Sequence, residues 1–253
     1  MSPPANRCPR SRARLLGRTL AFGLVCVGAL APSATAASRA PAILIGFTDH
    51  ATYQGDAASR IAALQHTKDV RARIVRITVA WLSIAPQQPP SDADAADPSW
   101  QGYRWEELDA VVRDVVAAGL DPLVSLTAAP AWAEGPNRPP VGADAPTGSW
   151  RPSPSAYGLF ARAVAGRYSG NTPDPAVMGA ALPRVRFWQA WNEPNLTDFL
   201  TPQWTQVGGK PKAASPEHYR LLNNAFYDGV KSVSSANFVV TAGTAPYGEP
   251  NPG

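Results

Sequence analysis

Short apolar runs alternate along the chain with stretches that have the periodicity of amphipathic helices. The strand-like runs are residues 43–46, 74–79, 122–127, 184–191 and 238–243. The helical stretches are residues 57–69, 105–118, 155–168 and 217–233. Parallel neighbouring strands need a crossover connection, which a helix usually makes. The alternation therefore predicts βαβ units and an α/β fold built on a parallel sheet.

The connections between these elements differ in length according to the direction of the chain. Those that follow strands are long, at 82–104, 128–154 and 195–215. Those at 119–121 and 234–237, which follow helices, are short, although the one before Arg184 is longer. In (β/α) enzymes, long loops after the strands build the active face at the carboxyl ends of the strands. We therefore expect a functional site at that end of the sheet.

The first 36 residues have the three regions of a secretory signal peptide. Five arginines precede an apolar run at 20–31, and residues 34–36 read Ala-Thr-Ala, a small-residue cleavage pattern. The apolar run is shorter than the about 20 residues that a spanning helix needs. We predict a secreted, extracellular protein whose mature part begins at Ala37, with no membrane association after cleavage.

Removal of this segment changes the charge of the chain. The full sequence carries a net charge of +4, but without the five arginines of residues 1–36 it carries 18 basic and 19 acidic residues, a net charge of −1. The basic balance therefore gives no support for a nucleic-acid partner. Both cysteines, Cys8 and Cys26, lie in the removed segment, and the three histidines are scattered without zinc-ligand spacing. We expect no metal site and no cofactor.

The fourth strand-like run ends in Trp191-Asn192-Glu193-Pro194. Proline has no N–H to donate, so Pro194 ends the strand ladder. Asn192 and Glu193 are therefore placed at the carboxyl end of a strand, where barrel enzymes carry their chemistry. A glutamic acid at that place can act as general acid and base on a glycosidic bond.

This segment resembles the strand-four motif of the clan A retaining glycoside hydrolases, which include family 5 cellulases and mannanases and family 39 xylosidases. The resemblance covers about residues 41–253. It implies an α/β fold of the (β/α)8 TIM barrel type, of which this chain supplies about the first five βα units. Residues 37–253 would then be the N-terminal part of a catalytic domain. A broken barrel is the alternative to such a fragment.

The same resemblance implies roles for three residues. Glu193 would be the acid/base, and Asn192 would hydrogen-bond the sugar 2-OH. Arg76, inside the apolar strand at 74–79, would hold the nucleophile ionised and oriented; an arginine that reaches solvent from the end of the strand is the alternative. In these families the nucleophile lies on strand seven, beyond the five strands found here. We therefore expect this chain to be inactive on its own.

Aromatic side chains after the strands are candidates for stacking on sugar rings. Trp132, in Pro-Ala-Trp at 130–132, resembles the exit of strand three in family 39-like enzymes, and Trp81 follows strand two. For both tryptophans, packing in the core is the alternative. Phe47, Asp49 and His50, after strand one, are further candidates for substrate contacts.

Together these features predict a secreted glycosidase that cleaves the O-glycosidic bonds of a β-linked polysaccharide, oligosaccharide or glycoside with retention. A catalytically inert glycan-binding barrel is the alternative, and a secreted structural protein is a third reading that leaves residues 191–195 unexplained. A strand-seven glutamate distinguishes the enzyme from the binder. If the chain alone were active, Asp49 or Glu134 would have to supply the second carboxylate.

Overall fold

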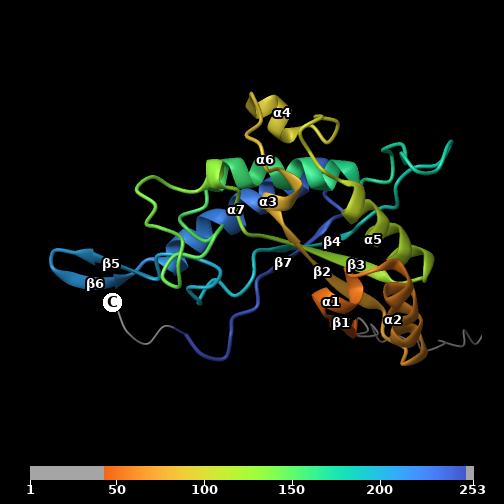
Figure 1. Ribbon diagram of the computed structural model, residues 1–253, viewed down its shortest axis with the longest axis horizontal. Helices are drawn as coiled ribbons and strands as arrows, with labels where there is room; N and C mark the ends of the chain where they lie inside the picture. The colour runs from red at the N-terminus through yellow and green to blue at the C-terminus, as the bar shows by residue number, and fades with distance from the viewer. Residues whose placement is uncertain (1–42, 249–253) are drawn as a thin grey trace, which may run out of the picture. The chain divides into compact units, whose positions relative to one another are not determined.

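The computed structural model describes residues 43–248, so the predicted signal peptide lies outside the described residues. The central feature is a five-stranded parallel sheet in the order β1-β2-β3-β4-β7 (Figure 1). Its strands are β1 (Gly46–Thr48), β2 (Ile74–Ala80), β3 (Asp121–Thr127), β4 (Phe187–Ala190) and β7 (Phe238–Thr241). Each new strand pairs with the one added before it, as successive βαβ units require.

Four long helices connect the strands of this sheet. They are α2 (Ala57–Asp69), α5 (Glu106–Ala117), α6 (Pro154–Arg167) and α7 (Ser215–Val233). Side chains cap two of them, since Asp56 accepts the Ser59 N–H before α2 and Ser153 accepts the Ala156 N–H before α6. The four helical stretches predicted from the sequence are confirmed, with ends that shift by two residues at most.

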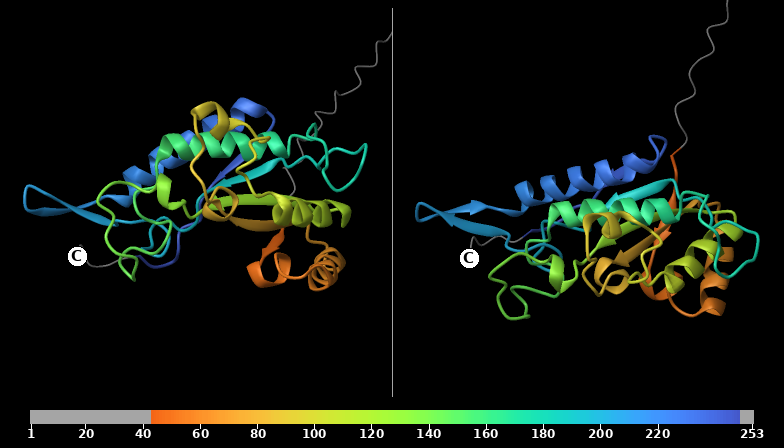
Figure 2. Two further views of the ribbon diagram at one scale, coloured as in Figure 1. Left: turned by 45° about the horizontal axis from the view of Figure 1, so that its top comes forward. Right: turned by 90° about the horizontal axis from the view of Figure 1, so that it is seen from above.

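Helices α6 and α7 lie side by side over the sheet, as both views of Figure 2 show. Two glycines permit this approach. A Cβ atom built on Gly229 would lie 2.2 Å from the carbonyl oxygen of Gly158, and one on Gly158 would lie 2.8 Å from the carbonyl oxygen of Ala225. No side chain fits in that space, so the backbones of the two helices meet directly.

The two faces of the sheet differ in polarity. In β2, Val75, Ile77 and Val79 are buried in the main hydrophobic core, where Trp188 of β4 is buried too. The alternate residues of β2 point to the opposite face and are only half-buried, and Arg76 is one of them. The candidate site forms on this second, mixed face.

The sheet is open at both ends of its strand order. In the described residues β1 pairs only with β2, and β7 pairs only with β4. Phe47 on β1 and Phe238 and Val240 on β7 are exposed. The barrel is therefore not closed by the part of the chain that the structure describes.

Two predicted strands begin three residues later than expected, and the last, expected at 238–243, ends at Thr241. The first was expected at 43–46, but β1 begins at Gly46, because its register places Gly46, Phe47 and Thr48 opposite the first residues of β2. The fourth was expected at 184–191. It begins later, at Phe187, because the Val185 N–H donates to the Tyr168 carbonyl at the end of α6 and not to a strand.

The connections that follow the strands contain short elements that the sequence did not indicate. They are α1 (His50–Tyr53), α3 (Trp81–Ile84), α4 (Asp92–Ala96), the 3-10 helix η1 (Ala131–Ala133) and a hairpin of β5 (Trp204–Val207) and β6 (Lys210–Ala213). The hairpin projects beyond the ends of the sheet in Figure 1. Its turn uses Gly208 and Gly209, both with positive φ, which tight hairpin turns require. Within residues 43–248, no helix combines the length and apolar character needed to cross a membrane.

Candidate active site

Arg76 lies at the centre of a polar network on the mixed face of the sheet. Its Nε donates to Oε1 of Gln189 at 2.6 Å, and its Nη2 donates to Oδ1 of Asn192 at 2.6 Å and to Oγ of Ser125 at 3.1 Å. These contacts join β2, β3, β4 and the segment that follows β4. The guanidinium is therefore fixed beside the Asn192-Glu193 pair, and it does not reach out to solvent from the end of the strand.

Gln189 and Ser125 hold this network to the backbone. The Gln189 Nε2 donates to the carbonyl of Thr241 on β7 at 3.0 Å, and the Ser125 Oγ donates to the carbonyl of Trp191 at 3.1 Å. The two residues are register partners on neighbouring strands, so both side chains point to the same face. Neither residue was predicted from the sequence. The available signal was a polar residue with apolar neighbours on both sides, inside each of the two strands.

The charge on Arg76 is partly desolvated and is close to Glu193. Burial lowers the pKa of the Arg76 guanidinium, and the Coulombic attraction of the Glu193 carboxylate raises it. In residues 43–248, Arg76 has no carboxylate within ion-pair distance, since its hydrogen-bond partners are two amides and a hydroxyl. A half-buried cation with neutral partners can orient an additional carboxylate at this place.

The backbone that carries Glu193 is strained. Trp191 has a φ of 69° and Glu193 a φ of 32°, in the left-handed region that favours glycine. The surrounding contacts hold this conformation: the Trp191 indole N–H donates to the Phe199 carbonyl at 2.9 Å, and the Leu196 N–H donates to the Glu193 carbonyl at 3.0 Å. Strain that persists under such constraint is typical of functional sites.

Two tyrosines from the covering helices fix the carboxyl ends of the strands. The Tyr157 hydroxyl of α6 donates to the Leu126 carbonyl of β3 at 2.7 Å and accepts the Trp191 N–H at 3.1 Å. The Tyr219 hydroxyl of α7 donates to the Ala190 carbonyl of β4 at 3.1 Å and accepts the Ala242 N–H at 2.6 Å. Each hydroxyl therefore joins two neighbouring strand ends. Burial raises the pKa of both phenols, so both remain neutral donors.

The two tryptophans predicted as sugar platforms occupy different environments. Trp81 is fully buried, and its ring stacks on Phe160 at 5.3 Å between centroids. The structure therefore gives it a position in the core, because α3 turns the chain back inward directly after β2. Trp132 is half-buried, packs edge-on against Trp81 at 5.4 Å and donates its indole N–H to the Ala85 carbonyl at 3.0 Å. It keeps part of its ring accessible.

The candidates on and directly after β1 lie beside β2 but make none of the contacts of Arg76. Phe47 is exposed on the edge strand, and Asp49 accepts the Thr52 N–H at 2.8 Å as the N-cap of α1. His50 lines a small cavity of about 150 Å³ together with Gln54, and Glu193 is not part of its lining. The structure therefore does not bring these three residues into the network around Arg76.

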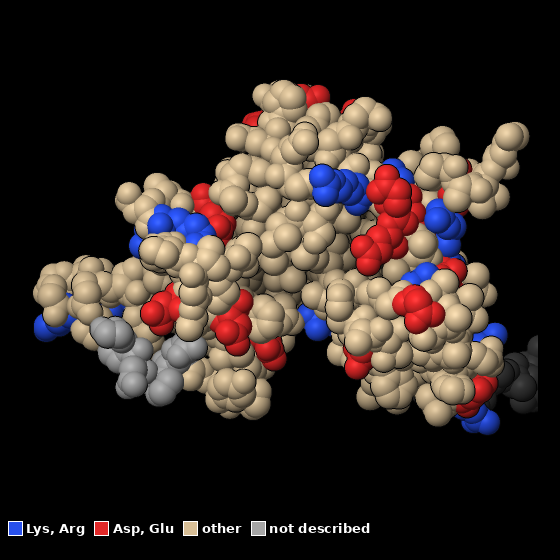
Figure 3. All heavy atoms as spheres, in the orientation of Figure 1, with Lys and Arg blue, Asp and Glu red and all other residues tan. Residues whose placement is uncertain are grey.

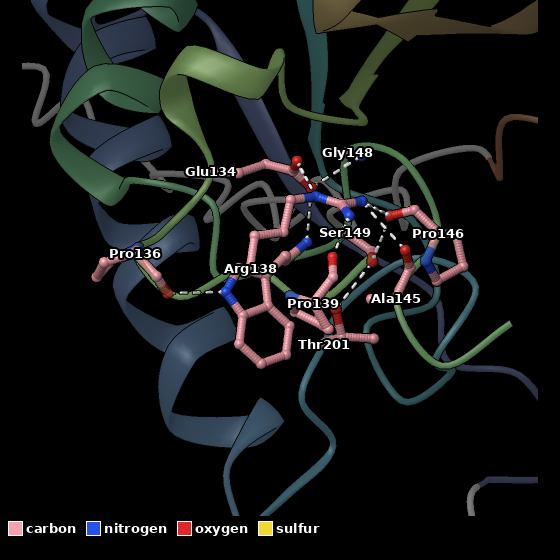
Figure 4. A network of polar contacts seen from close by, with 10 residues as sticks. Glu134, Pro136, Arg138, Pro139, Ala145, Pro146, Gly148, Ser149 and Thr201 are labelled. Carbon is pink, nitrogen blue, oxygen red and sulfur yellow. Dashed lines mark hydrogen bonds and ion pairs between the residues drawn. The ribbon is translucent and has the colours of Figure 1, made fainter. Parts of the chain in front are cut away.

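Glu134 is held within the long connection after β3, as Figure 4 shows. Its carboxylate pairs with Arg138 at 2.5 Å and accepts the N–H groups of Gly148 and Trp150, each at 3.0 Å, and its side chain is 3% exposed. Every contact serves to fold this loop, which Ser149 then anchors through its hydroxyl to that of Thr201. Glu134 and the capping Asp49 both have structural contacts, which leaves neither as the second carboxylate beside Glu193.

Within the described residues, no group of three or more histidine, cysteine, aspartate or glutamate side chains is arranged to hold a metal ion. On the face shown in Figure 3, basic and acidic side chains are interspersed and do not form one basic patch.

Comparison with known proteins finds no matching protein-family model and no matching curated protein. Solved structures do match. Fpglu1 from Fervidobacterium pennivoraus shares 20% identity at a TM-score of 0.51, over 75% of this chain and 40% of that chain. A family 39 glycoside hydrolase from Bacteroides cellulosilyticus WH2 shares 20% identity at 0.46, over 78% and 31%. A monomeric beta-xylosidase from Caulobacter crescentus CB15 shares 18% at 0.47, over 78% and 35%.

The chain thus spans between about a third and two-fifths of the length of these structures. At such low identity the likeness concerns the fold alone. Of the three structures, Fpglu1 is the one with a TM-score above 0.5. The predicted fold class is confirmed: a mostly parallel α/β sheet with helices, of the TIM-barrel type, in which the barrel is not closed within residues 43–248.

Proposed function

We propose that residues 37–253 are the N-terminal part of the catalytic domain of a secreted glycoside hydrolase that cleaves β-linked glycans or glycosides with retention. The observation that carries the proposal is the contact of Arg76, inside β2, with Asn192, which lies after the carboxyl end of β4 and directly before Glu193. A cation, an amide and a carboxylic acid meet there on a strained backbone, and these are the groups that glycosidic cleavage needs.

In this proposal Glu193 protonates the leaving oxygen and then activates water. The Oδ1 of Asn192 accepts from Arg76, so the Nδ2 amide group of Asn192 is the end that can donate to a sugar hydroxyl. The nucleophile lies outside the described residues, about 5–5.5 Å from Glu193, as retaining hydrolysis requires. Arg76, which has only neutral partners within residues 43–248, would bind that nucleophile and keep it ionised.

An inert glycan-binding barrel is the less favoured reading. Such a protein needs aromatic platforms, but it needs neither a half-buried guanidinium aimed at the Asn192-Glu193 pair nor the positive φ of Glu193. Both features lower the stability of the folded protein, and a catalytic role explains why they are present.

The stereochemistry of the first product tests the proposed reaction. The complete secreted protein is incubated with a β-linked oligosaccharide, and proton NMR spectra are recorded before the anomers equilibrate. Double displacement predicts that the β anomer appears first. If the α anomer appears first, the reaction is inverting and the proposed mechanism is wrong. Sequencing the N-terminus of the same sample tests secretion, with Ala37 as the expected first residue.

A further inference from the structure

A cleft of about 520 Å³ opens on the helical layer, at a distance from the strand ends that carry Glu193. Its walls are the segment before α5, the first turns of α5, the end of α6 and the connection that follows α6. In Figure 1, α5 and the C-terminal end of α6 lie to the right, whereas the loops that follow β3 and β4 lie to the left. The cleft is in the size range of small-molecule sites.

Three aromatic rings form one wall of this cleft. Trp100 meets Tyr103 edge-on at 5.0 Å between centroids, and Tyr103 meets Trp105 at 4.8 Å. Trp105 and Tyr103 are buried, while Trp100 is half-buried and lines the opening. The outermost ring therefore presents apolar surface to the cleft on a rigid aromatic base.

The chain around Trp100 is shaped to hold its indole in place. A Cβ atom built on Gly102 would lie 2.1 Å from Cη2 of Trp100, so the indole lies directly on the backbone of that glycine. The Trp105 indole N–H donates to the Pro98 carbonyl at 3.0 Å and closes the loop around the ring. The platform is thus preorganised, which reduces the entropy lost on binding.

The two arginines that line the cleft are both paired with aspartates. Arg113 contacts Asp174 at 2.9 Å, and Arg167 binds Asp109 through two hydrogen bonds of 2.8 and 2.5 Å. Arg167 also lies over the Trp105 ring at 5.0 Å. With both arginines neutralised and the exposed Glu106 on the rim, the cleft does not favour an anionic ligand.

We propose that this cleft is a second carbohydrate-binding site, which holds a neutral segment of a β-linked glycan against the helical layer. A sugar ring combines an apolar C–H face with a rim of hydroxyls. The first matches the Trp100 indole, and the second matches the polar groups of the rim, such as Gln101 and Glu106. This site goes beyond the proposed hydrolysis, because binding here involves neither Glu193 nor Arg76.

Binding measurements on the complete secreted protein test this site. The protein carries Glu193→Gln to slow cleavage and is titrated with xylohexaose, cellohexaose and mannohexaose by calorimetry and tryptophan fluorescence. We expect Trp100→Ala to weaken the binding of at least one hexaose about tenfold. Tyr227→Ala, which removes an exposed ring on α7, is the matched control and should leave that affinity unchanged.

A second variant distinguishes a loss of binding from a folding defect in Trp100→Ala. Gln101→Ala combined with Glu106→Ala removes only exposed rim side chains, and it should also weaken that binding while the melting temperature stays unchanged. Unchanged affinity in both variants, or no binding of any hexaose by the parent, overturns the proposal. Loss of binding through Trp132→Ala alone would place recognition at the strand ends. None of these results decides the hydrolytic role, which the stereochemistry of the product tests separately.

Discussion

At the scale of single residues, replacement of Arg76 tests whether the polar network around it is catalytic or structural. We expect Arg76→Met to lower kcat of the complete enzyme by about 10²–10³-fold and to change KM little, because the nucleophile would be less ionised and misplaced. Steady-state kinetics with a β-glycoside measures both values. Arg73→Met, at an exposed position just before β2, is the control and should be neutral. Normal turnover in Arg76→Met, with only a lower Tm, would make Arg76 a structural residue.

The sequence indicated single candidate residues but not the contacts that join them around Arg76. Asn192 was predicted from its motif after a strand, and its contact with Arg76 is seen only in the structure. Gln189 lies 113 residues from Arg76 in the sequence, and no local pattern predicts their hydrogen bond. For Trp81, the position directly after a strand suggested an exposed ring. The four-residue helix α3 instead places the ring in the core.

At the scale of elements, the two tyrosine bridges are predicted to differ in strength. Loss of the Tyr157 hydroxyl leaves the Trp191 N–H still bonded to the Leu126 carbonyl at 3.0 Å. The Ala242 N–H, by contrast, donates to the Tyr219 hydroxyl at 2.6 Å. We therefore expect Tyr219→Phe to cost about 1–3 kcal/mol of unfolding free energy and Tyr157→Phe about 1 kcal/mol or less. Urea unfolding of both variants checks this order.

Tyr227→Phe, an exposed tyrosine on the same helix as Tyr219, is the control and should unfold like the parent. Equal losses in Tyr157→Phe and Tyr219→Phe would show that the bridges do not act at the strand ends as described.

Local patterns determined the helices but not the edge strand or the hairpin. The four long helices have amphipathic or capped sequences, and their positions are confirmed. The first strand was misplaced because three exposed apolar residues, Ile43, Leu44 and Ile45, carry the stronger local signal. The true bounds depend on pairing with β2, which is a contact between distant segments. The β5–β6 hairpin lies in a stretch whose strands are short and largely exposed, so no apolar alternation marks it.

At the scale of the whole molecule, the open sheet governs the behaviour of residues 37–253 on their own. The edges at β1 and β7 are unpaired on one side within the described residues, and Phe47, Phe238 and Val240 are exposed there. Such edges promote aggregation or pairing with another chain. We expect this segment alone to be inactive and to form dimers or larger species in size-exclusion chromatography with light scattering.

The addition of three further βα units should restore both a monomer and hydrolysis, because it would pair the edges and supply the nucleophile. A monomeric, cooperatively melting 37–253 segment that cleaves a β-glycoside would contradict this account of the fold. It would also require a second carboxylate within the segment, although Glu134 and Asp49 are both engaged in structural contacts.

The central claim is that Glu193 is the acid/base of a retaining glycosidase, and its substitution by glutamine in the complete enzyme tests that claim most directly. Glutamine cannot protonate a leaving oxygen, so kcat/KM on alkyl glycosides and oligosaccharides should fall by about 10²–10⁴-fold. Activated aryl glycosides should still form the glycosyl-enzyme, and azide should restore turnover and yield a β-glycosyl azide. Glu217→Gln, at an exposed carboxylate on α7, should change none of these rates. Equal losses on both substrate types without azide rescue would contradict the assignment of Glu193.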